Sequence, residues 1–157
     1  MKLKILIYKL YIKRNFAINK FRIKKLRFFG ASIGAKTISY GRFTVINIPN
    51  LVIGQNSTIN EGVHINCRDK VIIGNNVHLS SNVQIHTGKL VIDRFPRYHD
   101  KAPIVIEDDV WIASNVTILS GVSIGKKSII AAGSIITKNI PENSLVMGTP
   151  GKVVKTI

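Results

Sequence analysis

The stretch "IEDDVWIASNVTILSGVSIGKKSIIAAGSIITKNIP", residues 106–141, carries an isoleucine at every sixth position. The repeated residues are Ile106, Ile112, Ile118, Ile124, Ile130 and Ile136. A helix turns roughly 100° per residue, so it would place residues six apart about 120° out of phase. Val, Ile and Thr alternate with Gly, Asn and Ser, a composition typical of short strands joined by tight corners. The period therefore predicts a solenoid in which each repeat points one large aliphatic side chain inward.

The same period continues toward the N-terminus. It forms two further runs of aliphatic residues: Ile53, Ile59 and Ile65, then Ile73, Leu79 and Ile85. The step from Ile85 to Ile106 is 21 residues, so fifteen residues are inserted into the repeat, and we expect a loop at about 87–103. Stacked coils share one core, and burial of each aliphatic side chain stabilises the fold by about 1.5–3 kcal/mol.

Length and composition suit one folded domain, since the chain has 157 residues of which 45% are apolar. The single cysteine, Cys67, excludes an internal disulfide and fits a reducing compartment. We expect it to be a small buried apolar residue. No cluster of His, Cys and carboxylate residues shows the spacing of metal ligands, so we expect no metal site.

Positive charge is concentrated in residues 1–30, which contain ten Lys or Arg residues and no acid, in a chain of formal net charge +15. Lys4, Lys9 and Lys13 interrupt its apolar residues. The segment therefore predicts neither a signal peptide nor a bilayer-spanning helix, which needs about 20 mostly apolar residues. Apolar residues recur at roughly helical spacing, which predicts one or two basic amphipathic helices.

Two uses of this basic segment stay open. It could adsorb to an anionic membrane surface, or it could pack on its own domain or on a neighbouring subunit. No recognition motif accompanies the charge, so we do not expect nucleic-acid binding. We expect the protein in the cytoplasm, at the inner face of the membrane if residues 1–30 adsorb there.

Two long motifs, "VIEDDVWIASNVTILSGVSIG" (105–125) and "AAGSIITKNIPENSLVMGTPGKVVK" (131–155), resemble the hexapeptide-repeat acyltransferases. The nearest type is the sugar O-acetyltransferases that modify maltose, galactosides and capsular polysaccharide. The resemblance implies an all-β solenoid: a left-handed parallel β-helix of triangular section over residues 31–157, preceded by the helical segment 1–30. It also implies a homotrimer with active sites in the clefts between neighbouring solenoids.

The family uses an acyl-coenzyme A donor, so the resemblance implies acetyl-CoA. The implied cofactor-binding residues are Ser114, Ala132, Gly133, Thr137, Lys138, Lys152 and Lys155. Small residues let the pantetheine arm approach the backbone, and lysines attract the nucleotide phosphates. For the small residues, tight stacking of the coils is an open alternative. By the same resemblance, Asn60 and Trp111 would contact the acceptor sugar.

Acyl transfer to a hydroxyl needs a general base, and a neutral imidazole is well tuned for this at pH 7. The family places its catalytic histidine at the root of the inserted loop, where this chain has Leu90 within the string "HTGKLVID". Three accounts stay open. His86 acts from a shifted position, or His99 acts from the loop, oriented by Asp100 or Asp93. In the third, the chain has lost catalysis and keeps a binding or structural role.

The predicted function is acetyl-CoA-dependent O-acetyl transfer to a sugar, or to a precursor of a surface polysaccharide or lipid-linked glycan. Arg68, Arg94 and Arg97 favour an anionic or lipid-phosphate-linked acceptor. The alternative is a catalytically impaired hexapeptide solenoid that binds CoA or a sugar, or that serves as a trimeric scaffold.

Overall fold

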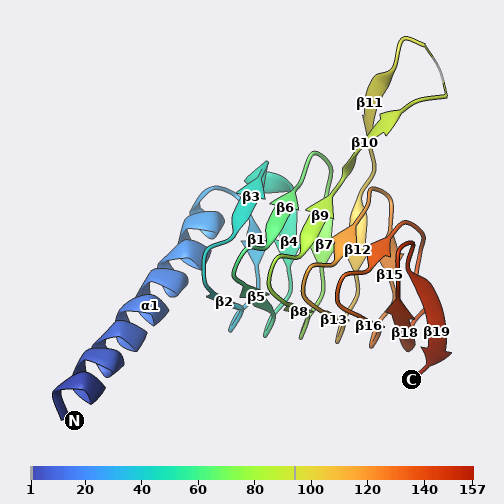
Figure 1. The fold of residues 1–157 in the computed structure, drawn as a ribbon. Coiled ribbons are helices and arrows are strands. Elements are labelled where there is room, and N and C mark those ends of the chain that lie inside the picture. Colours follow the sequence, from blue (N-terminus) through green and yellow to red (C-terminus); the bar gives the residue numbers. More distant parts are fainter. Residues whose placement is uncertain (1, 94) are drawn as a thin grey trace.

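The computed structural model describes residues 2–93 and 95–157 and shows one helix followed by a parallel β-solenoid (Figure 1). The predicted all-β solenoid is confirmed. Arg94, one of the arginines predicted to favour an anionic acceptor, lies outside the described residues.

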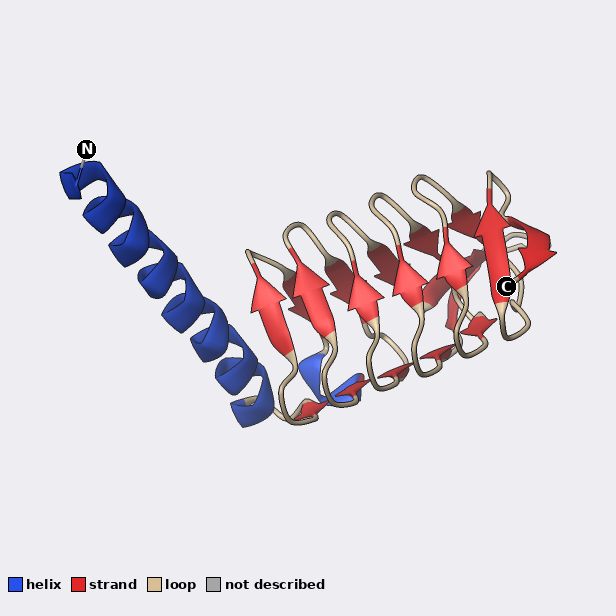
Figure 2. Ribbon diagram, turned by 90° about the horizontal axis from the view of Figure 1, so that it is seen from below, coloured by secondary structure: helices blue, strands red, loops and turns tan. Residues whose placement is uncertain are grey.

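Each coil contributes one short strand to each of three faces, so the coils stack as a three-sided prism (Figure 2). The first face contains β1 (Ser32–Ile33), β4 (Leu51–Ile53), β7 (Val71–Ile73), β12 (Ile104–Ile106) and β15 (Ser123–Ile124). The second contains β2 (Ile38–Tyr40), β5 (Thr58–Asn60), β8 (His78–Leu79), β13 (Trp111–Ile112), β16 (Ile129–Ile130), β18 (Ser144–Met147) and β19 (Lys152–Thr156). The third contains β3 (Thr44–Ile46), β6 (His64–Asn66), β9 (Gln84–His86), β14 (Thr117–Ile118) and β17 (Ile135–Ile136).

The strands pair in parallel from coil to coil, except that β19 returns antiparallel to β18 at the end of the prism. A short 3₁₀ helix, η1 (Ile48–Asn50), links the third face to the first between β3 and β4. On the first face, Ile53, Ile73, Ile106 and Ile124 occupy equivalent positions in successive coils. The six-residue period therefore aligns the isoleucines as the sequence predicts.

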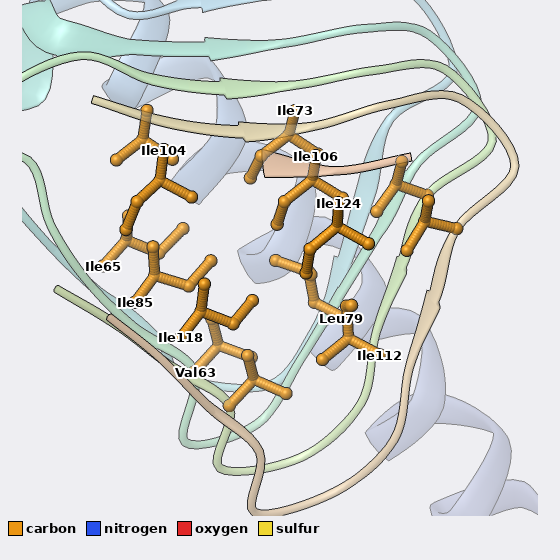
Figure 3. Packing of buried hydrophobic residues seen from close by; sticks show 14 of the residues in the cluster. Val63, Ile65, Ile73, Leu79, Ile85, Ile104, Ile106, Ile112, Ile118 and Ile124 are labelled. Atoms are coloured by element: carbon orange, nitrogen blue, oxygen red, sulfur yellow. The ribbon is translucent and has the colours of Figure 1, made fainter. Parts of the chain in front are cut away.

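These aliphatic side chains fill the inside of the prism, where those of Ile85, Ile106, Ile112 and Ile118 are fully buried (Figure 3). Each repeat also buries the residue two positions before its large aliphatic. The second inward set includes Ser57, Val77, Val83, Val116 and Val122. Each repeat thus places two side chains in the core, and the second must be small or branched to fit the corner.

Corners between the first and second faces need a left-handed backbone. Asn56 and Asn76 adopt positive φ angles of 57° and 54°, which asparagine tolerates better than most residues. Asp109 takes the same position in a later coil with φ 60°. The Asn-rich corners predicted from the repeat are therefore present.

The basic segment forms one helix, α1 (Lys2–Phe28), whose last turns pack on the first coil (Figure 1). Ile23 and Leu26 are buried against the coil. The Arg22 guanidinium donates a hydrogen bond to the Gly41 carbonyl at 2.8 Å, and that of Arg27 donates to the Gly34 carbonyl at 2.8 Å. The end of α1 is therefore fixed to the solenoid by both apolar and polar contacts.

The helix is not amphipathic along its free part, which differs from the sequence prediction. Ile5, Leu6, Ile7 and Tyr8 are consecutive, and all four are exposed. Four consecutive residues span nearly a full helical turn, so apolar side chains point in all directions around the axis. Among the described residues, no helix combines the length and apolar content that crossing a membrane requires.

The insertion folds as an antiparallel hairpin of β10 (Gly88–Val91) and β11 (Tyr98–Lys101), which projects from the prism (Figure 1). Its root is held by Thr87, whose hydroxyl donates to the Asn66 carbonyl at 2.9 Å. The backbone N–H of Asp69 donates to the same hydroxyl at 3.0 Å, and the Ser120 hydroxyl donates to the Thr87 carbonyl at 2.7 Å. Thr87 is fully buried, so this network fixes the angle at which the hairpin leaves the coil.

Candidate active site

A cavity of about 250 Å³ lies where the hairpin leaves the third face. Its lining residues come from two adjacent coils and from both hairpin strands: Asn66, Arg68, His86, Gly88, Lys89, Leu90 and His99. Both candidate bases, His86 and His99, therefore line one cavity. From sequence alone they are separate alternatives, whereas the structure brings them together.

His86 is the last residue of β9, and its side chain projects outward because the preceding Ile85 points into the core. Its ring centroid lies 5.6 Å from that of His64 in the neighbouring strand β6. Partial burial, and then the charge of His64, lowers the pKa of His86 below the ordinary histidine value. Near pH 7 the His86 imidazole is therefore neutral and able to accept a proton.

Asn66 is a second polar residue of the cavity and is not among the site residues predicted from the sequence. It pairs directly with His86 across the parallel strands β6 and β9. The Asn66 Oδ1 atom is buried and has no hydrogen-bond partner within residues 2–93 and 95–157. Buried polar atoms normally have partners, so this oxygen is a free acceptor beside the candidate base. The signal available in the sequence was its position, twenty residues before His86, which is one coil.

His99 lies opposite Leu90 in the hairpin register. Directly opposed residues of an antiparallel pair project from the same face, so the His99 side chain lies beside the leucine that occupies the family's histidine position. Asp100 does not orient His99, because its carboxylate accepts from the Lys101 N–H at 2.7 Å and pairs with Lys89 at 3.3 Å. That part of the sequence prediction is wrong, since neighbouring residues of a strand project from opposite faces.

The predicted acceptor residues lie on the second face, away from this cavity in a single copy of the chain. The Trp111 side chain is exposed, and its indole N–H donates to the Ser80 hydroxyl at 3.4 Å. The Asn60 amide donates to the Leu79 carbonyl at 2.9 Å. His78 lies beside Trp111 with ring centroids 5.8 Å apart. Together these residues form a polar and aromatic surface next to the corner that leads to the third face.

Three of the predicted cofactor residues lie at that corner in successive coils. The Gly133 N–H donates to the Ser114 carbonyl at 3.0 Å, and Ala132 precedes Gly133 on the exposed outside of the same turn. Gly133 has φ +71°, and a side chain built there would meet no atom within 4 Å. Coil stacking therefore does not require glycine at this position, although the left-handed backbone favours it.

The remaining predicted cofactor residues are exposed near the C-terminal end of the prism. Thr137 and Lys138 follow β17 at the next corner, and Lys152 and Lys155 lie on β19. Within the described part of the chain, none of these three lysines forms an ion pair. They are available to bind an anionic group such as a nucleotide phosphate.

The remaining residues considered for chemistry are Cys67, His64 and His78. Cys67 is buried as predicted, and burial raises its thiol pKa to about 12. His64 and His78 lie on the outer faces, as expected from their repeat positions. The described residues contain no group of three or more His, Cys, Asp or Glu side chains able to hold a metal ion.

Comparison with known proteins agrees with this geometry. Residues 103–138 match the family profile "Bacterial transferase hexapeptide (six repeats)", and residues 50–85 match "Hexapeptide repeat of succinyl-transferase". The solved maltose O-acetyltransferase of Clostridium difficile 630 is 33% identical, with a TM-score of 0.80 over 87% of this chain and 74% of that one. The chain belongs to the hexapeptide-repeat acetyltransferases. The solenoid is therefore the left-handed β-helix that this family shares.

Two other hexapeptide-repeat acetyltransferases extend the comparison. One, from Vibrio cholerae O1 biovar eltor, was solved in complex with acetyl coenzyme A; it is 29% identical, with a TM-score of 0.80 over 94% of this chain and 83% of that one. The galactoside O-acetyltransferase of Lactococcus lactis is 34% identical over 134 residues, which cover 82% of this chain and 58% of that protein. The chain spans about half the length of the curated relatives it matches.

Proposed function

We propose that this chain transfers the acetyl group of acetyl-CoA to a hydroxyl of a sugar or glycan. The observation that carries the proposal is the cavity at the hairpin root, which holds a neutral imidazole, His86, beside an unpartnered acceptor, Asn66 Oδ1. A relative with the same fold binds acetyl-CoA, and another is named for acetylating maltose. Both names agree with this chemistry.

In the proposed reaction, His86 removes the proton from the acceptor hydroxyl as its oxygen attacks the thioester carbonyl carbon. A C–O bond forms, the C–S bond breaks, and the proton passes from His86 to the departing CoA thiolate. Asn66 Oδ1 can accept a hydrogen bond either from the acceptor or from the His86 ring, and so hold one of them in place. His99 is the alternative base, since it lines the same cavity from the hairpin.

The acceptor that we favour is anionic, as in a phosphate-linked glycan. Arg68 lines the cavity, whereas Lys89 of β10, which also lines it, already pairs with Asp100. A guanidinium can bind phosphate or carboxylate oxygens through two parallel hydrogen bonds. An enzyme that acetylates neutral free sugars faster than anionic or lipid-linked glycans would rule this acceptor class out.

We also propose that the active unit is a homotrimer with each site between two copies. Asn60 and Trp111 lie on the second face. His86 lies on the third face and His99 on the hairpin that leaves it, so one copy does not bring the two sets together. A neighbouring copy can place its second face against the cavity. Light scattering should give a mass of about three chains of 17.4 kDa, and a monomeric active enzyme would contradict the shared site.

The test of function is release of CoA thiol from acetyl-CoA by the full chain, with and without a glycan extract. Acetyl transfer predicts thiol release that depends on the extract, with the label of radioactive acetyl-CoA recovered on the glycan. Binding of acetyl-CoA with neither thiol release nor labelled glycan would favour the alternative, a catalytically impaired solenoid. Leu90, at the position of the family's catalytic histidine, is the observation that supports this alternative.

Replacement of His64 by glutamine should move the acidic limb of the pH–rate profile to higher pH. The positive charge of His64 disfavours the protonated form of His86 and so lowers its pKa. Without that charge the pKa of His86 rises, and a higher pH is needed to keep the base neutral. Measurement of kcat/KM against pH checks this shift. A Lys36→Gln variant, which removes a cation from the first coil, should keep the midpoint of the limb; equal shifts in both variants would contradict the coupling.

Replacement of Lys152 and Lys155 by glutamine removes two cations and should raise the KM for acetyl-CoA on the order of 100-fold with little change in kcat. An exposed charge-assisted hydrogen bond to phosphate contributes about 1.5 kcal/mol, and it is made equally before and during the reaction. The test compares acetyl-CoA with its 3′-dephospho analogue. If these lysines bind the ribose phosphate, the variant should discriminate less between the two donors; unchanged discrimination would mean that they do not.

A further inference from the structure

We infer that α1 is an arm that binds the surface of an anionic lipid bilayer. The segment 1–30 carries ten cations and no acid. Every side chain that the structure describes between Lys4 and Ile12 is exposed, and this part of α1 points away from the prism (Figures 1 and 2). A helix of 27 residues is about 40 Å long, so the free part reaches well beyond the first coil.

The free part of α1 is also strongly apolar. From Leu3 to Ile12, eight of the ten residues are apolar and two are cations. Ile7 and Leu10 are 59% and 58% exposed, which is costly for large aliphatic side chains in water. At a bilayer surface these side chains can enter the boundary between headgroups and acyl chains. The lysine stems can extend past them to place their charges among the lipid phosphates.

Cations continue down to the foot of the helix. A groove of about 180 Å³ lies between α1 and the first coil, and the cations that line it are Lys20, Lys24, Arg27 and Lys36. No carboxylate is among the described residues that line it. Because Arg27 is fixed to the Ile33 and Gly34 carbonyls at 3.1 and 2.8 Å, the groove is held in shape by the solenoid.

A second copy of the chain is a poorer occupant of this surface than lipid. All eight acidic residues follow residue 60, and several are already engaged: Asp100 with Lys89, Glu142 with Lys126, and Asp108 with Asn75. Two α1 helices side by side would bring like charges together. Nucleic acid would satisfy the cations but not the exposed aliphatic side chains. An anionic bilayer satisfies both.

The test is co-sedimentation of the full chain with vesicles of phosphatidylcholine alone or mixed with anionic phosphatidylglycerol. The chain should pellet with the anionic vesicles, and raising the salt should weaken the binding. A Lys4→Gln, Lys20→Gln, Lys24→Gln variant should bind on the order of 100-fold more weakly, because each cation near the surface contributes about fivefold. An Ile5→Gln, Leu6→Gln, Ile7→Gln variant should also bind more weakly, at the same charge.

The matched control removes three lysines from the solenoid instead: Lys70→Gln, Lys126→Gln and Lys127→Gln. It should bind within a few-fold of the unaltered chain. Equal loss in this control, or equal pelleting of all variants, would overturn the assignment, and so would no pelleting of the unaltered chain. A change of molecular mass in the α1 variants without any vesicle binding would point to a second copy and also overturn it. Vesicle binding is measured without acetyl-CoA, so its outcome is independent of the acetyl-transfer reaction.

Discussion

Replacement of His86 by alanine is expected to lower kcat for acetyl transfer by about 10²–10⁴-fold, the range that a positioned general base contributes. The His86 imidazole lines the cavity at the hairpin root, and burial together with His64 keeps it neutral. Alanine removes the only proton acceptor that β9 presents there, while the strand and its pairing with β6 and β14 remain. The KM for acetyl-CoA should change little, because the imidazole acts on the acceptor hydroxyl.

The matched variant is His99→Ala, which removes the other imidazole of the same cavity. It should lower kcat far less than His86→Ala, by about tenfold or less, in line with a positioning contribution. Thermal unfolding of both variants should match that of the unaltered chain, since both side chains lie outside the core. A large loss of kcat in His99→Ala with a small loss in His86→Ala would mean that His99, not His86, is the general base. A small loss in both would mean that neither histidine is the base.

Replacement of Ile118 by alanine is expected to destabilise the fold by about 3–4 kcal/mol, within the range of large-to-small changes in well-packed cores. Ile118 is fully buried on β14, next to Ile85 of β9 (Figure 3). On its other side it pairs with Ile136 of β17. Strands above and below hold the backbone in register, so the coil has little freedom to close the cavity that the substitution leaves. Chemical unfolding at one fixed protein concentration measures the loss, because subunit assembly adds to apparent stability.

The control for this prediction is Thr117→Ala on the same strand. Its side chain faces outward and is only half-buried, so it should cost about 0.5 kcal/mol or less. Ile118→Val should be intermediate, at about 0.5–1.5 kcal/mol. If Ile118→Ala and Thr117→Ala destabilised the chain equally, the inward isoleucine column would not be the main source of stability.

The repeat could be predicted because its cause is local and recurs. Each six-residue unit forms a strand of two or three residues followed by a corner. Ile106, Ile112 and Ile118 therefore occupy the same structural position in successive units. The fully buried Ile53, Ile73 and Ile85 confirm the earlier runs. Two steps in the early coils are eight residues long, from Val45 to Ile53 and from Ile65 to Ile73. They also have a physical cause, since the connections from the third face to the first are longer there, and one contains η1.

The candidate site was harder to predict because it depends on which segments meet in space. Alternation along β9 was enough to place His86 outside. The opposition of His99 and Leu90 required the hairpin register, and the free Asn66 Oδ1 required knowledge of its neighbours. A spacing of twenty residues between Asn66 and His86 equals one coil, so a search of the sequence for polar residues one coil apart would have found the pair.

The structure of the basic segment could be predicted from the sequence only in part. Its charge and helical tendency were readable from residues 1–30, but the spacing of Ile7 and Leu10 wrongly suggested an apolar face. Consecutive Ile5, Leu6 and Ile7 spread apolar surface around the axis instead. The contact of Ile23 and Leu26 with the first coil could not be read from periodicity, because that contact depends on the surface that the first coil offers.

The most direct test of the proposed acetyl transfer is a crystal structure of the full chain with acetyl-CoA bound. We expect the thioester to lie in a cleft between two copies, with the pantetheine arm along the corner of Ser114 and Gly133. The carbonyl carbon should lie where a hydroxyl within about 3 Å of the His86 ring could attack it. Acetyl-CoA bound away from the hairpin-root cavity would contradict acetyl transfer at His86. A cavity closed to the thioester by the neighbouring copy would contradict it too.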